Sequence, residues 1–243
     1  MLNIDEKFNN ELEIFRRESE TCLQLLYCYL TINVALSRDT SILTSLNRAP
    51  IFWKTILYAL QSSYFIGLGR IFDQDSPHNL DRIIKMAQDN LSIFSKNSLA
   101  DRKRKQASNA YSWIDEYLKK VYVPTSKDFR RLRKLIKKYR SLYEVSYRDI
   151  RGKIFAHNNI TAESEKNQLF QKTSASEMQK LIIFLYKIYN TLWELFQNGK
   201  KPVLRPMPYS VEKMMKQKSV LWRSPTWQES VVLEAQEFLY SLK

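Results

Sequence analysis

The chain has 243 residues, 44% of them hydrophobic and 13% aromatic, which excludes a disordered or collagen-like protein and suits one large domain or two small ones. It carries 39 Lys/Arg against 25 Asp/Glu, a net charge of +14, which favours an anionic partner such as nucleic acid or an acidic membrane surface. Only four glycines occur, where average usage would give roughly 17. Tight turns and open α/β folds need glycine, so its scarcity indicates long helices with few connections.

Apolar residues recur at three- and four-residue spacings along most of the chain, which is the periodicity of helices. Pro50 stands where a first-turn proline belongs, Ser174 to Glu177 matches a capping box, and Asn198-Gly199 matches a helix stop. These signals predict an all-α bundle of long antiparallel helices. The predicted helices are Asp5–Leu36, Pro50–Phe72, Leu80–Met86, Leu99–Val121, Ser126–Phe155 and Ser176–Gln197.

The domain organisation follows from where the long helices end. We expect residues 1–200 to form the bundle and residues 201–243 to form an irregular proline-containing tail, with one or two short helices packing on the bundle. The longest uncharged stretch has seventeen residues, Thr21 to Ser37, which is shorter than the ~20 apolar residues of a bilayer span. No signal peptide opens the chain, and Cys22 and Cys28 lie too far apart on one helix to pair. We therefore expect no membrane association and a cytoplasmic location.

The positive charge is concentrated in one part of the chain. Between Asp101 and Arg140 there are 14 Lys/Arg and 4 Asp/Glu. Two interpretations stay open, a solvated helical face or a surface that neutralises the phosphates of RNA. The candidate RNA-binding residues are Arg130, Arg131, Arg133, Lys134, Lys137 and Lys138.

Histidine is scarce, and this limits the possible enzyme classes. The chain has two histidines, and the ligand spacings of zinc and di-iron sites, the GxSxG of hydrolases and the glycine motifs of nucleotide-binding folds are all missing. We therefore predict no metal and no cofactor. His78 follows Pro77 in a predicted turn and is interpreted as a surface residue, which leaves His157 as the candidate catalytic group.

Arg151 and His157 lie six residues apart near the end of a predicted long helix. Histidine exchanges protons near neutral pH, and arginine is a permanent planar cation suited to phosphate, so together they can cleave RNA through its 2′-hydroxyl. On a continuous α-helix the two side chains would point about 120° apart. Either the helix bends near Gly152, or two copies pool their residues in a homodimer, with an interface using aromatic residues such as Tyr143 and Tyr147. The alternative is a histidine that caps or packs and an arginine that is solvated.

The stretch Arg151-Gly-Lys-Ile-Phe-Ala-His157-Asn resembles the R-x(4–6)-H signature of the HEPN superfamily, in the R-D-K-x-x-A-H form of the abortive-infection family of the AbiU type. Leu68-Gly69-Arg70-Ile71-Phe72-Asp73 is similar to an Ile/Leu-Phe-Asp element on an earlier helix of that family. The resemblance covers roughly residues 50–200. It implies a helical bundle that dimerises, with Arg and His of both chains in one cleft, and a metal-independent endoribonuclease of phage defence or a toxin–antitoxin system.

The resemblance implies that Arg151 and His157 are catalytic, and that RNA, a second copy and a cognate antitoxin are partners. Gly152 departs from the polar residue usual after the arginine, so the alternative is a catalytically weak HEPN protein that acts as an RNA- or protein-binding dimeric module. Arg70 and Asp73 either line the cleft or form an ion pair along their helix. The candidate supporting residues are Arg148, Asp149, Lys153, Asn158, Arg70 and Asp73.

Overall fold

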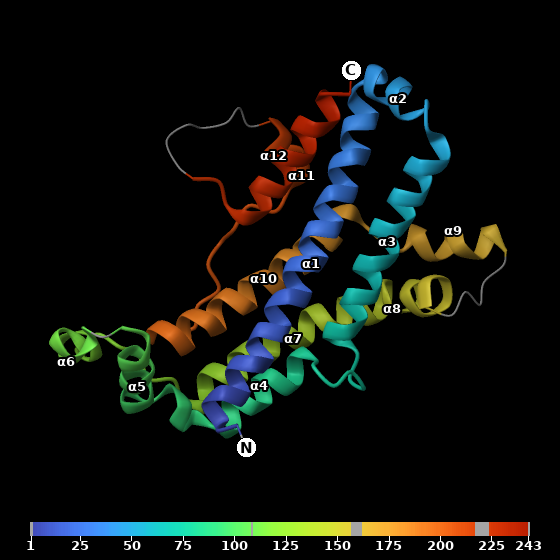
Figure 1. Ribbon diagram of the computed structural model, residues 1–243. Helices are drawn as coiled ribbons and strands as arrows, with labels where there is room; N and C mark the ends of the chain where they lie inside the picture. Colours follow the sequence, from blue (N-terminus) through green and yellow to red (C-terminus); the bar gives the residue numbers. More distant parts are fainter. Residues whose placement is uncertain (1, 108, 157–161, 217–223, 243) are drawn as a thin grey trace. The chain divides into compact units, whose positions relative to one another are not determined.

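The computed structural model describes residues 2–107, 109–156, 162–216 and 224–242. Within these ranges the regular structure is helical, without a strand, which confirms the all-α prediction (Figure 1). The chain divides into two compact units, each assembled from three segments. The first unit comprises Met1–Glu18, Arg70–Tyr143 and Phe184–Arg205, and the second comprises Ser19–Gly69, Glu144–Ile183 and Pro206–Lys243.

Long helices contribute residues to both units, because four of the five unit boundaries fall inside one of them. These helices are α1 (Ile4–Arg38), α3 (Pro50–Phe72), α7 (Ser126–Ser146) and α10 (Ala175–Asn198). The shorter helices are α2 (Thr40–Leu46), α4 (Leu80–Asp89), α5 (Lys96–Gln106), α6 (Ile114–Lys119), α8 (Arg148–Ile150), α9 (Glu163–Gln171), α11 (Val211–Lys216) and α12 (Trp227–Tyr240).

The predicted helix ends are confirmed where a proline or a glycine marks them. α3 begins at Pro50 and ends at Phe72, as the sequence predicts. α10 ends at Asn198 and is followed by Gly199, whose backbone lies in the left-handed region with φ +57°. A Cβ at this position would also lie 2.5 Å from Cγ1 of Val121. Only glycine therefore fits both the backbone conformation and the space.

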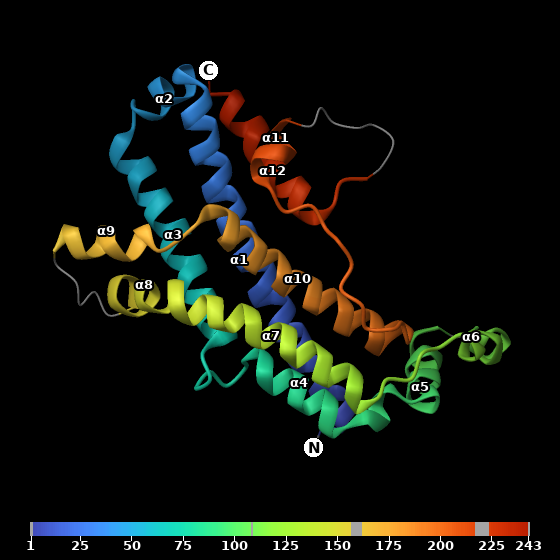
Figure 2. The ribbon, with the colours of Figure 1, turned by 180° about the vertical axis from the view of Figure 1, so that it is seen from behind.

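The predicted helix Leu99–Val121 is wrong. α5 ends at Gln106, Ala107 has an extended backbone (φ −140°, ψ 121°), and a 3₁₀ turn at Ala110–Ser112 leads into the separate α6. Figure 2 shows α5 and α6 as two neighbouring short helices. Residues 103–109 offer no large apolar side chain for burial. Tertiary packing therefore does not stabilise a continuous helix there.

The core of the first unit is an aromatic cluster. The Phe8 ring lies 5.4 Å from the Phe94 ring and 5.0 Å from the Phe196 ring, and the Phe129 ring lies 5.4 Å from that of Phe94. All four rings are buried. They come from α1, the 3₁₀ turn Leu91–Phe94, α7 and α10, so the cluster joins the three segments that make up this unit.

In the second unit the end of the chain is bonded to α1. α11 and α12 lie side by side in both views (Figures 1 and 2). The hydroxyl of Tyr27 on α1 donates to the carbonyl of Tyr209 at 2.8 Å, and burial raises the pKa of Tyr27. The two short helices lie where the sequence analysis places the tail, whereas the domain boundary at residue 200 stays a prediction. None of the described helices combines the length and hydropathy that a bilayer span needs.

Candidate functional site

The segment that carries Arg151 does not continue α7. α7 ends at Ser146, Tyr147 departs from helical geometry (φ −123°, ψ −26°), and α8 covers only Arg148–Ile150. Arg151–Ala156 then winds as a π-helix, which we call η3. The predicted continuous helix Ser126–Phe155 is therefore wrong at Tyr147. Single π-helical turns are rare and occur frequently at functional sites.

Tyr147 explains where α7 ends. Its side chain is fully buried, and its hydroxyl donates to the carbonyl of Ser174 at 3.3 Å. Burial raises the pKa of Tyr147 to about 12. The ring also lies 6.3 Å from that of Phe65 on α3. Burial of this large side chain outweighs local helix propensity, which is a weak preference.

The π-helix η3 is anchored by the ring of Phe155. This ring stacks on Phe65 at 5.1 Å and lies 5.8 Å from Tyr58 and 6.5 Å from Phe170. Tyr58 and Phe65 belong to α3 and Phe170 to α9, so two helices of the second unit hold the segment. Ile154 next to it is buried. Aromatic contacts of this kind each add about 0.5–1.5 kcal/mol beyond the burial of their area.

Arg151 lies at the first position of η3 and is half-buried, with its Nε atom shielded from solvent. Its backbone N–H donates to the carbonyl of Tyr147 at 3.0 Å. Partial burial strengthens the field that a guanidinium exerts on a nearby anion, because the local dielectric is lower than that of water. η3 ends at Ala156. The predicted residues His157 and Asn158 follow it in the sequence and lie outside the described residues.

The remaining candidates beside Arg151 are exposed. Asp149 and Lys153 form an ion pair of 2.8 Å one helical turn apart, and both side chains are more than half exposed, at 57% and 51%. Such a surface pair contributes little to stability. Arg148 is also exposed. A supporting role in catalysis stays a prediction for all three.

Gly152 does not occupy a position that demands glycine. Its backbone lies outside the left-handed region, and a Cβ there would meet no atom within 4 Å. The position after the motif arginine is therefore open to a larger side chain. The departure from the family pattern is chemical, since a polar group is missing, and is not forced by the backbone.

Arg70 and Asp73 belong to the first unit, whereas Arg148, Asp149, Arg151 and Lys153 belong to the second. Nη1 of Arg70 lies 3.3 Å from Oε1 of Glu18 on α1, so Arg70 pairs with a carboxylate of another helix. Asp73 accepts a hydrogen bond from the hydroxyl of Tyr143 at 3.2 Å. A role of Arg70 and Asp73 in a cleft stays a prediction.

The predicted basic residues share one face of α7 in the first unit. At 100° per residue, the five exposed members lie within about a third of the helix circumference, and Arg133 lies half-buried beside them. The opposite face buries Phe129, Leu132 and Ile136. Within the described part of the chain none of the six forms an ion pair. We call this surface the α7 basic face; its exposed members are Arg130, Arg131, Lys134, Lys137 and Lys138.

A comparison with family models assigns the chain. The model described as AbiU2, of the HEPN superfamily, matches residues 5–212. The chain belongs to the AbiU2 HEPN family. Neither the curated proteins nor the solved structures contain a significant match. The resemblance found in the motif thus extends over almost the whole chain.

AbiU2 is an abortive-infection family, and the part of the chain that matches it includes the features described above. The matched range contains α3, the α7 basic face and η3, and it ends within α11. α12 lies beyond the AbiU2 match. In the described residues no group of three or more His, Cys, Asp and Glu side chains is arranged to hold a metal ion.

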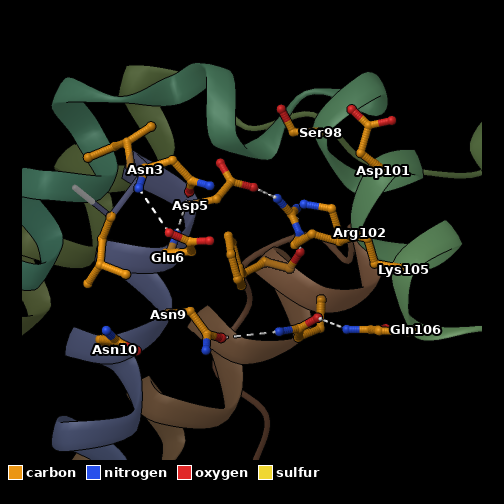
Figure 3. A pocket seen from close by; sticks show the side chains of 14 residues that line it. Asn3, Asp5, Glu6, Asn9, Asn10, Ser98, Asp101, Arg102, Lys105 and Gln106 are labelled. Atoms are coloured by element: carbon orange, nitrogen blue, oxygen red, sulfur yellow. Dashed lines mark hydrogen bonds and ion pairs between the residues drawn. The ribbon is translucent and has the colours of Figure 1, made fainter.

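Arg102 is a structural residue that lies within the basic 101–140 stretch, for which the sequence left a solvated face and an RNA-binding surface open. On α5, it donates to a carboxylate oxygen of Asp5, to the carbonyl of Ile93 at 2.9 Å and to that of Phe196 at 2.8 Å. Its guanidinium carbon lies 4.0 Å from the centre of the Phe196 ring, and burial lowers its pKa. Figure 3 shows Arg102 and Asp5 pointing toward each other. No local signal reveals this role, because Asp5 and Phe196 each lie more than ninety residues away along the chain.

We expect Arg102→Met to lower the free energy of unfolding by about 2–4 kcal/mol, since it removes charge-assisted bonds to three partners and leaves Asp5 unpaired. Lys105→Met, on the same helix and exposed, removes the same charge and is expected to change the free energy by less than about 0.5 kcal/mol. Chemical denaturation followed by circular dichroism measures both values. Equal destabilisation by the two variants would contradict the assigned role.

Proposed function

We propose that this AbiU2-family protein is a homodimeric, metal-independent endoribonuclease that acts in abortive-infection defence against phage. The observation that carries the proposal is the position of Arg151. It opens a rare π-helical segment anchored on α3, six residues before His157, in a chain of the AbiU2 family. Arginine and histidine are the two groups that this chemistry requires.

The proposed reaction is an internal attack within RNA. The imidazole of His157 takes the proton of a ribose 2′-hydroxyl, and the oxygen forms a bond to the adjacent phosphorus. The guanidinium of Arg151 stabilises the charge on the phosphorane, and the bond to the 5′-oxygen breaks as that oxygen takes the proton from the imidazolium of His157. The products are a 2′,3′-cyclic phosphate and a 5′-hydroxyl. DNA lacks the 2′-hydroxyl and is not cut by this route.

The α7 basic face suits the binding of this substrate. Its five exposed cations form no ion pair within the described residues, so their charges are available to phosphates. Neutralising phosphates releases counterions and supplies most of the non-specific affinity for nucleic acid. The solvated-face interpretation predicts no such binding, and charge reversal on this face distinguishes the two.

The homodimer is proposed because the HEPN resemblance implies one cleft that contains the Arg and His of both chains. Tyr143 and Tyr147, which the sequence analysis expected at the interface, are fully buried within the chain, so that expectation is wrong. The first half of α3 offers an alternative. Ile51, Phe52 and Tyr58 are 81%, 58% and 58% exposed and lie on one face of the helix.

This α3 apolar face, defined by Ile51, Phe52 and Tyr58, is continuous with the motif segment because the Tyr58 ring lies 5.8 Å from that of Phe155. Between Pro50 and Gly69 the only charged residue is Lys54. Two chains of net charge +14 repel each other least where neither presents cations. A second copy docked by the same face would form a two-fold symmetric contact, in which each residue of the face occurs once in each copy.

We expect the double variant Ile51→Glu/Phe52→Glu to be monomeric at micromolar concentration, because a symmetric contact would bury four added carboxylates near one another. Sedimentation velocity gives the oligomeric state. Phe238→Glu is the matched control, since Phe238 on α12 is 55% exposed and lies outside the α3 apolar face. A wild-type monomer, or a double variant that dimerises like the wild type, would contradict the proposed interface.

The activity is tested by incubating the purified protein with end-labelled single-stranded RNA in the presence of EDTA. We expect cleavage that leaves 2′,3′-cyclic phosphate ends. A strict requirement for a divalent metal would contradict the proposed chemistry.

The scaffold alternative has one observation in its favour, the glycine at position 152 where the family has a polar residue. It predicts a dimer that binds RNA or protein and leaves RNA intact, and it also predicts that loss of His157 has no cellular effect.

A further inference from the structure

A second basic feature of the first unit is a cavity of about 530 Å³ beside the end of α10. Residues 117–122, from α6 and the turn after it, form one side, and residues 198–205 form the other. Lys120, Lys200, Lys201 and Arg205 line it, together with Tyr117 and Tyr122. No lining residue is acidic. The cavity therefore carries four cations and two aromatic rings around a space of ligand size.

Two of the four cations, Lys120 and Lys201, are available to a ligand, whereas the charges of Lys200 and Arg205 both act on the nearby carboxylate of Glu194. Nζ of Lys200 lies 2.9 Å from Oε2 of Glu194, a neighbouring carboxylate that also accepts from the side-chain amide of Asn198. Lys120 and Lys201 are exposed, and neither of them forms an ion pair within the part of the chain that the structure describes. The available charge suits an anion with several oxygen atoms, such as a phosphate group.

The walls of the cavity are built by specific backbone contacts. The carbonyl of Gly199 accepts from the backbone N–H of Tyr122 at 2.8 Å, and the carbonyl of Asn198 accepts from the hydroxyl of Tyr117 at 2.9 Å. The left-handed Gly199 packs against Val121 in a space that no side chain could share. The two sides of the cavity are thus held together without a ligand.

Tyr122 connects the cavity to the α7 basic face. Its hydroxyl donates to Oδ2 of Asp128 in the first turn of α7 at 2.9 Å. The positive charge of Arg131 acts on both Tyr122 and Asp128. The cavity therefore lies at the N-terminal end of that face. The half-buried ring of Tyr122, with Nζ of Lys201 5.8 Å from its centre, has the character of a base-stacking surface beside a phosphate site.

The larger cavity of about 720 Å³ in the same unit lacks this character (Figure 3). Its lining has both signs of charge, Arg102 is bound to Asp5, and the carboxamide of Gln197 bonds those of Asn9 and Gln106. Several of its polar groups thus bind one another, whereas the lining of the smaller cavity carries only positive charge.

We propose that the smaller cavity binds one nucleotide unit of single-stranded RNA, with its phosphate held by Lys120 and Lys201 and its base against the ring of Tyr122. This inference rests on the proposed function in taking RNA as the ligand. The nucleotide site extends the α7 basic face and gives the strand a fixed point in the first unit.

The test uses full-length protein carrying His157→Ala, so that the RNA stays intact, and a short fluorescent single-stranded RNA. We expect Lys120→Ala/Lys201→Ala to raise Kd at least about tenfold near physiological salt and to reduce the slope of log K against log salt by up to about 0.7, the value for one lost phosphate contact on a single strand. The control Lys119→Ala/Lys96→Ala removes the same number of positive charges. Lys119 lies next to Lys120 in the sequence but pairs with Glu116 at the surface, and neither lysine lines the cavity. This control is expected to change Kd less than twofold. Equal losses in both double variants would overturn the proposal.

Tyr122 provides an independent readout of stacking. Tyr122→Leu removes the ring and is expected to raise Kd about fivefold or more. Tyr122→Phe keeps the ring but loses the hydrogen bond to Asp128, and it is expected to bind RNA like the protein with Tyr122 intact. Adenosine 5′-monophosphate is expected to displace the RNA at lower concentration than adenosine or inorganic phosphate. Equal competition by the three would contradict a nucleotide site.

Failure of this inference and failure of the proposed function are distinguishable, because binding is measured without cleavage. If the protein with His157 intact leaves RNA uncut while the Lys120/Lys201 variant loses binding, the cavity assignment holds and the ribonuclease proposal fails. If RNA is cut and the cavity variant binds like its control, the cavity assignment fails and the ribonuclease proposal stands.

Discussion

Replacing His157 with alanine is expected to lower the rate of RNA cleavage by about 10²–10⁴-fold, because a general base typically contributes that factor. Circular dichroism and thermal unfolding are expected to match the wild type. The assay is cleavage of end-labelled single-stranded RNA in EDTA under single-turnover conditions. Equal cleavage by the wild type and His157→Ala would refute the assignment of the base.

Arg151→Ala is expected to reduce cleavage by a comparable factor, since it removes the cation that stabilises the phosphorane. Arg151→Lys keeps the charge, loses the planar fork and is expected to rescue poorly. Arg48→Ala is the matched control, because Arg48 is an exposed arginine of the second unit that lies outside the motif segment. A loss of activity in Arg48→Ala as large as that in Arg151→Ala would mean that general charge, and not position, determines the rate.

Charge reversal on the α7 basic face has the second large expected effect. Lys134→Glu/Lys137→Glu/Lys138→Glu removes three phosphate contacts, each contributing about 0.7 to the salt slope for a single strand, so RNA affinity is expected to fall about 100-fold at 0.1 M salt and to depend less on salt. Fluorescence anisotropy with the His157→Ala protein measures the affinity.

The control for this variant changes net charge equally. Lys7, Lys85 and Lys96 are exposed and lie in the first unit, outside the α7 basic face. Reversing all three is expected to weaken binding only through the overall field, by less than about tenfold. Unchanged binding after reversal of the α7 lysines would identify that face as merely solvated.

Long helices with marked ends were predictable from the sequence. The limits of α3 follow from Pro50 and from a regular apolar pattern, and the end of α10 follows from Gly199. α2 and α9 were not predicted, because helices of seven and nine residues carry few periodic positions. The break after Gln106 was also not predicted. It occurs in a polar run, which offers no apolar side chains whose packing would extend the helix.

The composition of the motif was predictable, whereas its backbone was not. Arg151 is identifiable from residue types and spacing alone. The π-helix depends on tertiary burial of Tyr147 and Phe155 against Phe65, which lies more than eighty residues earlier in the chain. Local propensity contains no information on that contact. The structural role of Arg102 was not predictable either, because the fold brings its partners together.

The exposed face of α3 escaped the sequence analysis for a related reason. Apolar residues along one side of a helix indicate burial, and Tyr64, Leu68 and Ile71 are indeed buried. Phe52 continues the same stripe but is 58% exposed. A signal was present in the near absence of charge from Pro50 to Gly69, since a helix apolar on all sides needs partners beyond one neighbour.

The central claim is that Arg151 of one copy and His157 of another act together in one site, and mixing two inactive variants tests it most directly. Arg151→Ala and His157→Ala proteins are mixed, allowed to exchange subunits and assayed for RNA cleavage in EDTA. Random exchange yields heterodimers in which one of the two sites has both groups intact, so the mixture is expected to regain about a quarter of the wild-type activity. A mixture that stays as inactive as either variant alone, after exchange is demonstrated, would contradict the shared site.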